Sequence, residues 1–74
     1  MKIDELLPVG TVFQHIETFS NYPVYWSISL GVYERDNGSR ALVLVDFTGG
    51  RVEYGFQRGS YMDRCAEKCF KVIE

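Results

Sequence analysis

The sequence is short of the residues from which many metal sites and nucleic-acid-binding surfaces are built. It has two cysteines and one histidine, whereas a structural zinc ion needs about four such ligands. Ten acidic residues outnumber eight basic ones and give a formal net charge of −2. A protein that binds nucleic acid mainly through the phosphates shows a basic excess instead. The composition therefore argues against a zinc-dependent fold and against a phosphate-driven nucleic-acid binder.

Long apolar runs are also missing. No stretch approaches the roughly 20 apolar residues that span a bilayer, and the N-terminus lacks the pattern of a secretory signal peptide. We therefore expect a cytoplasmic protein, in which a structural disulfide between Cys65 and Cys69 is disfavoured. The two cysteines stay open to three interpretations: buried or half-buried free thiols, a redox pair, or half of a metal site. We expect no cofactor.

What the sequence does contain is apolar and aromatic side chains, at 46% and 15% of its 74 residues. A chain of this length forms one domain, here residues 1–74. Such a domain buries only about 60% of the surface that its unfolded form exposes, so its margin of stability is small. The apolar content is nevertheless enough for a compact core without metal ions or cross-links.

Three consecutive antiparallel strands are predicted in the middle of the chain. Their residues alternate with period two, or are apolar on both faces, as in half-buried and central strands. The strands are expected at residues 24–33, 41–48 and 51–57. Asn37-Gly38 and Gly49-Gly50 separate them, and such pairs are typical of two-residue hairpin loops with positive φ angles.

Shorter elements are expected on both sides of these strands. The N-terminal segment favours a helical turn at residues 1–7, followed by a first strand at residues 11–19 whose imperfect alternation indicates a bulge. A short helix is expected at residues 61–68, with Ser60 as its N-cap. The chain is then expected to close with a short strand at residues 69–73.

Five strands with one helical turn before the last resemble, in element order, a small SH3-like barrel. The resemblance covers nearly the whole chain and implies a scaffold, not an activity. We therefore expect a mainly β fold: a small five-stranded antiparallel SH3-like barrel or roll with one short C-terminal helix before the last strand. The alternative is an antiparallel sheet with that helix on one face, an α+β roll.

The predicted two-residue loops fix a strand register, and the register assigns each side chain to one of two faces. One face is apolar and is expected to be the core. Its members are Trp26, Ile28, Leu30, Val32, Val43, Val45, Phe47, Val52, Tyr54 and Phe56. The other face is mixed, and its rows are Ser29, Asp46 and Glu53; Gly31, Leu44 and Gly55; and Tyr33, Leu42 and Gln57.

The mixed face is the predicted binding surface. Asp46 and Glu53 would oppose each other as like charges, which is destabilising unless solvent, a basic partner or a metal ion relieves the repulsion, or the pair serves acid–base chemistry. Leu44 would point outward between two glycines, which either allow a barrel to coil or leave a flat spot for a partner or the C-terminal helix. The residues predicted to contact a partner are Tyr25, Tyr33, Leu42, Leu44, Asp46 and Glu53.

No catalytic signature accompanies these residues. His15 lies on one strand with Glu17, but no serine or cysteine motif stands beside it, so we expect neither catalytic residues nor a metal site. We predict a non-enzymatic module that occupies a surface of a partner protein, as an accessory protein or a phage-type regulator or inhibitor; self-association is a variant. The alternative is a small barrel that binds single-stranded nucleic acid, with tyrosines stacking on bases beside scattered arginines.

Overall fold

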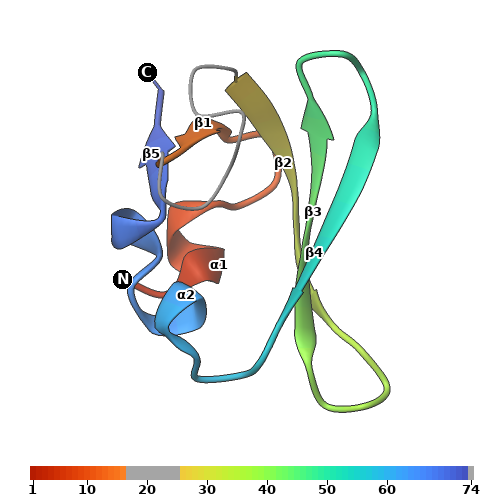
Figure 1. Cartoon of the computed structure of the whole chain (residues 1–74), viewed down its shortest axis with the longest axis vertical. Helices are drawn as coiled ribbons and strands as arrows, with labels where there is room; N and C mark the ends of the chain where they lie inside the picture. Colours follow the sequence, from red (N-terminus) through yellow and green to blue (C-terminus); the bar gives the residue numbers. More distant parts are fainter. Residues whose placement is uncertain (17–25, 74) are drawn as a thin grey trace.

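The computed structural model describes residues 1–16 and 26–73 and shows one five-stranded antiparallel sheet with short helices (Figure 1). The strands follow the order β4-β3-β2-β1-β5 across the sheet. Their bounds are β1 Val12–His15, β2 Trp26–Glu34, β3 Arg40–Asp46, β4 Arg51–Phe56 and β5 Phe70–Val72. Within the described residues, β4 and β5 lie at opposite edges and do not pair, so the sheet is not closed into a barrel.

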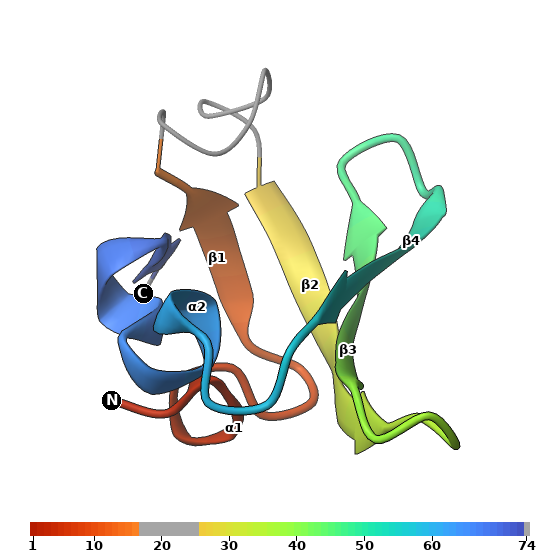
Figure 2. The same ribbon diagram turned by 60° about the horizontal axis from the view of Figure 1, so that its bottom comes forward.

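The prediction of a mainly β fold with five antiparallel strands is therefore confirmed, but the closed SH3-like barrel is not found in the described part of the chain. Figure 2 shows the β3–β4 hairpin on one side of β2 and the helices beside β1 on the other. The end of the predicted first strand and the start of the second, Tyr25 included, lie outside the described residues.

In the described ranges, three short helical segments accompany the sheet: α1 at Ile3–Leu6, α2 at Tyr61–Arg64 and the 3₁₀ turn η2 at Ala66–Lys68. The single helix predicted at residues 61–68 is split at Cys65, whose φ of −125° and ψ of 51° lie outside the helical region. Ser60 makes no side-chain cap. No helix in the described ranges is long and apolar enough to cross a membrane.

The first hairpin closes with a three-residue loop instead of the predicted two. The Arg35 N–H donates to the Ser39 carbonyl at 2.8 Å, which leaves residues 36–38 as the loop. Gly38 has a φ of 85°, but Asn37, like every other described non-glycine residue, has a negative φ. A type I′ turn requires positive φ at both central residues. The loop is therefore a turn followed by one left-handed glycine, the usual form of a three-residue hairpin loop.

The second hairpin closes in the same way. The Asp46 N–H donates to the Gly50 carbonyl at 2.9 Å, and Gly49 has a φ of 87°. The Asp46 carboxylate holds this loop, because its Oδ1 accepts hydrogen bonds from the Thr48 N–H, the Thr48 hydroxyl and the Gly50 N–H. Gly49 and Gly50 were expected to form the whole loop. Instead, Gly49 is the last of three loop residues, and Gly50 pairs with Asp46 to close the loop.

The longer loops change the register between strands. Val45 of β3 faces Arg51 of β4, where the two-residue loop predicts Tyr54. A shift by an odd number of residues exchanges the two faces of a strand relative to its neighbour. On the other side of β3, a bulge between Ser29 and Gly31 brings Ile28 opposite Val45.

This register places Leu42 and Leu44 in the core, at 0% and 1% exposed, so the prediction that they face outward is wrong. The sheet face that carries them is called the inner face below, and the opposite one the outer face. The inner face packs with residues of α1, η2 and the segment before β5. The core cluster comprises Ile3, Leu7, Phe13, Leu42, Leu44, Phe56, Ala66, Cys69 and Phe70. Trp26, predicted to be in the core, is 44% exposed.

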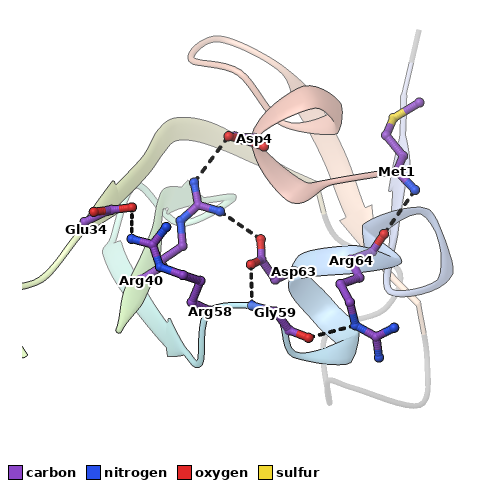
Figure 3. Close-up of polar contacts among 8 residues, drawn as sticks. All are labelled: Met1, Asp4, Glu34, Arg40, Arg58, Gly59, Asp63 and Arg64. Carbon is purple, nitrogen blue, oxygen red and sulfur yellow. Dashed lines mark hydrogen bonds and ion pairs between the residues drawn. The ribbon is translucent and has the colours of Figure 1, made fainter. Parts of the chain in front are cut away.

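A charged cluster joins β3 to the helices (Figure 3). The Arg40 guanidinium donates to Asp63 Oδ1 of α2 at 2.8 Å and to Asp4 Oδ2 of α1 at 3.3 Å. Asp63 Oδ2 also accepts the Gly59 N–H at 2.7 Å. The Arg40 and Asp63 side chains are only 13% and 8% exposed, so this ion pair is largely desolvated. The cluster fixes both helices against one end of the inner face.

Candidate functional site

A row of apolar side chains crosses three strands on the outer face and continues onto the residue after β5. Strand pairing sets Val12 of β1 opposite Ile28 of β2, and Ile28 opposite Val45 of β3. The Ile73 N–H, directly after β5, donates to the Val12 carbonyl at 2.8 Å, which brings Ile73 to the other side of Val12. Side chains opposite one another on a sheet face lie about 5 Å apart. The row therefore forms one continuous apolar strip.

Trp26 lies beside this strip, because it is two residues before Ile28 on the same face of β2. Val12, Trp26, Ile28 and Ile73 together line a shallow hollow of about 360 Å³, and these four residues are called the Trp26 patch below. Trp26 and Ile73 are 44% and 36% exposed. Large apolar side chains gathered at one exposed place on a protein are typical of an interaction site.

Two cations border the Trp26 patch and its strip. Lys71 of β5 faces Gln14 of β1, which in turn faces Trp26. Arg51 of β4 faces Val45 at the end of the strip. Both Lys71 and Arg51 are exposed. A partner that covers the strip would therefore meet the positive charge of Lys71 on one side, whereas Arg51 on the other side shares the outer face with Glu53, two residues along β4.

The residues predicted to contact a partner do not form one surface. Tyr33 and Glu53 are exposed on the outer face, where Tyr33 pairs with Ala41 and Glu53 with Val43. Asp46 lies opposite Ser27 on the inner face, where its carboxylate holds the second hairpin loop. The other three predicted residues are Leu42 and Leu44, which are in the core, and Tyr25, which lies outside the described residues.

The predicted opposition of Asp46 and Glu53 is also wrong. Because β4 is shifted against β3, the two carboxylates point to opposite faces of the sheet. Hydrogen bonds from the Thr48 hydroxyl and from the loop amides lower the pKa of Asp46. Glu53 lies 3.6 Å from the guanidinium of Arg35. Each carboxylate therefore has its own partner, and no like-charge pair is present at this place.

The two glycines expected beside an outward leucine have separate structural uses. Gly31 follows the bulge with a φ of 105°, and its N–H donates to the Ser29 hydroxyl at 3.0 Å. Gly55 lies under the Arg35 guanidinium, which occupies the space that a Cβ would need. Leu44, the leucine expected between them, is buried at 1% exposed, so the flat apolar spot predicted around it does not exist.

A second hollow, of about 350 Å³, opens on the inner face beside His15 and the second hairpin loop. His15 is 7% exposed, and its ring contacts the rings of Phe13, Tyr54 and Phe70 at centroid distances of 5.4 to 5.7 Å. Burial lowers the pKa of His15, because a protonated imidazole would lose its hydration among these rings. Asp46 lines the same hollow, but its carboxylate is engaged by the loop.

The cysteines are free thiols, Cys65 half-buried and Cys69 buried, as one of the three interpretations predicted. Burial raises the pKa of the Cys69 thiol, so this group stays protonated near neutral pH. Within residues 1–16 and 26–73, no group of three or more histidine, cysteine, aspartate or glutamate side chains is placed to hold a metal ion.

The Trp26 patch was missed because the two-residue second loop put the apolar residues of β4 on the same face as Trp26 and Ile28, which made that face resemble the core. The buried serines of β2 carry the signal that could have found it. Ser27 and Ser29 are 4% and 0% exposed, and the Ser29 hydroxyl donates to the Leu7 carbonyl at 2.7 Å. Because side chains alternate along a strand, burying Ser27 and Ser29 on the inner face leaves Trp26 and Ile28 on the outer face.

Comparison of the chain with protein-family models, with curated proteins and with solved structures finds no match. The function is therefore inferred from the geometry of the chain itself.

Proposed function

We propose that this chain is a small non-enzymatic module that acts by occupying a surface of a partner protein through the Trp26 patch. The observation that carries the proposal is the 44% exposure of Trp26 beside an apolar strip that crosses three strands and ends at Ile73. Tryptophan is among the residues most enriched in the energetic centres of protein interfaces. Its indole buries a large apolar area and loses little conformational freedom on binding.

The size of the effect can be worked from the exposure. The exposed 44% of Trp26, taken over an indole side chain of about 250 Å², is roughly 100 Å², and its burial contributes about 2–3 kcal/mol. A partner side chain that fills the hollow of the Trp26 patch would bury Val12, Ile28 and Ile73 as well. The adjacent strands β1 and β2, with Ile73 hydrogen-bonded to Val12, supply the backbone of this hollow, so little ordering is needed when the partner binds.

The charges around the patch favour one kind of partner. Lys71 borders the patch, so a partner with an apolar anchor and an acidic residue at its margin would be complementary. Charges at the rim of an interface mainly guide the approach and the choice of partner, whereas the apolar centre supplies affinity. Covering the partner in this way is the mechanism that an accessory protein, regulator or inhibitor of this size would use.

The test is an affinity capture from native lysate with three baits: the wild type, Trp26→Ala and Tyr61→Ala. Tyr61 is 51% exposed on α2, away from the patch, and serves as a matched aromatic control. Each capture is run with and without nuclease and read by quantitative mass spectrometry. We expect one protein that the wild type and Tyr61→Ala retain equally, that Trp26→Ala loses by at least about tenfold, and that nuclease does not affect.

Equal recovery on all three baits would contradict the role of the Trp26 patch. Recovery that disappears with nuclease would instead support the single-stranded nucleic-acid alternative. Thermal unfolding of each bait controls for folding: Trp26→Ala also removes the buried part of the indole, so the captures are run well below the melting temperature of every bait.

A further inference from the structure

The free edge of β4 points to a second interaction, independent of the Trp26 patch: we propose that two copies of this chain pair their β4 strands antiparallel about a two-fold axis at Val52. β4 is six residues long and, within the described residues, has β3 as its only neighbour. Figure 1 shows β4 at the margin of the sheet, on the side away from the helices. An edge strand with unpaired backbone groups is a template for another strand.

The backbone groups available at this edge follow from the hairpin loop. The Asp46 N–H donates to the Gly50 carbonyl, so the even-numbered residues of β4 are the ones whose backbone faces β3. The N–H and C=O groups of Arg51, Glu53 and Gly55 therefore point away from β3, toward the open edge. Pairing between β3 and β4 runs without a bulge, and β4 contains no proline, so the edge lacks two common protections.

The side chains at the edge are complementary to themselves. Arg51 and Glu53 are two residues apart on the outer face of β4, both are exposed, and they carry opposite charges. In an antiparallel pair centred on Val52, Arg51 of each copy lies opposite Glu53 of the other, at a Cβ separation of about 5 Å. Two ion pairs form on the outer face, and the two Val52 side chains meet on the inner face.

The neighbouring symmetric registers are less favourable. A pair centred on Glu53 places the two Glu53 side chains opposite each other, which is destabilising. A pair centred on Tyr54 sets Glu53 opposite Gly55 and leaves Arg51 without a carboxylate. Only the register centred on Val52 pairs every charge of the strand. Arg35 lies 3.6 Å from Glu53 within its own chain, so Glu53 would sit between two guanidinium groups in the dimer.

The dimer would be one continuous ten-stranded sheet with both outer faces on the same side. It would therefore present two Trp26 patches to one partner assembly, and two linked sites bind more tightly than either alone when the partner offers both contacts. This consequence depends on the proposed function, whereas the pairing of β4 does not.

Charge reversal tests the proposal with a built-in rescue. Arg51→Glu leaves two acidic residues on the strand, and Glu53→Arg leaves two basic ones. We expect the wild type to reach twice the 8.5-kDa chain mass in light scattering as concentration rises. Each single variant should raise the dissociation constant at least about tenfold, because like charges then oppose each other. An equimolar mixture of the two variants should form a heterodimer. Lys71→Glu, with the same change in net charge on β5, should dimerise like the wild type.

Amide hydrogen exchange gives a second readout that does not depend on the variants. The Glu53 N–H should exchange more slowly as the protein concentration rises, since it becomes hydrogen-bonded in the dimer. A wild type that stays monomeric up to millimolar concentration would overturn the proposal. So would a dimer that charge reversal leaves unchanged, or a dimer in which the Glu53 N–H gains no protection.

Discussion

Leu44→Ala is the substitution that separates the observed strand register from the one that two-residue loops would give. Leu44 is 1% exposed and belongs to the core cluster, and truncation of a core leucine costs about 2–5 kcal/mol. Because Leu44 also lines the hollow beside His15, solvent can reach part of the space that is left. We therefore expect a loss of about 2–3 kcal/mol in the free energy of unfolding. For a small domain this lowers the melting temperature by about 10–20 °C.

The assay is urea unfolding followed by circular dichroism, with Val45→Ala as the control. Val45 is the next residue along β3, half-buried on the outer face between Ile28 and Arg51. Removing its two methyl groups should cost about 1 kcal/mol or less. If Val45→Ala destabilised the protein as much as Leu44→Ala, or more, the assignment of Leu44 to the inner face would be refuted.

Two further predictions concern buried charge. Asp63→Ala removes the carboxylate that lies 2.8 Å from the largely buried Arg40 guanidinium, and it should lower the free energy of unfolding by about 2 kcal/mol. Asp4→Ala removes a half-exposed carboxylate at 3.3 Å and should cost at most about 1 kcal/mol. Equal losses for the two variants in urea unfolding would contradict a larger contribution of the Arg40–Asp63 pair. Burial lowers the pKa of His15, so below about pH 6.5 the unfolded chain binds a proton that the folded protein rejects. The free energy of unfolding should therefore fall as the pH drops from about 6.5 toward the folded-state pKa, and His15→Phe should flatten this dependence. Parallel urea titrations between pH 7 and 5 that show the same slope for both proteins would contradict the burial of a neutral imidazole.

Much of the architecture could be predicted from the sequence. Alternating apolar residues and paired turn residues mark the strands, and the antiparallel order follows from the short connections between them. The length of the hairpin loops could not be read in the same way. Asn37-Gly38 and Gly49-Gly50 fit a two-residue loop with two positive φ angles, but they fit equally a three-residue loop in which one glycine takes the left-handed conformation. The second arrangement occurs, at Gly38 and Gly49.

This difference of loop length decides the candidate site. Because side chains alternate along a strand, a shift of three residues exchanges the faces of β4, and the buried serines of β2 place Trp26 outside. The Asp46 carboxylate stabilises the longer loop by accepting hydrogen bonds from its amides. This same carboxylate was predicted to lie on the binding face. The core was therefore predicted on the face of Trp26 instead of the face of Leu42 and Leu44 for one reason, the exchanged faces of β4.

The most direct test of the proposed function uses Trp26 itself, which is the single tryptophan of the chain. The protein is labelled with 5-fluorotryptophan, and its ¹⁹F resonance is followed while the protein recovered in the affinity capture is added. We expect the signal to shift or broaden in a saturable way, because the partner replaces water around the exposed indole. A tenfold excess of unlabelled wild type should reverse the change, whereas the same excess of unlabelled Trp26→Ala should not. A resonance that keeps its position and width when the complex is saturated would show that the partner binds elsewhere and would contradict the Trp26 patch as the site of recognition.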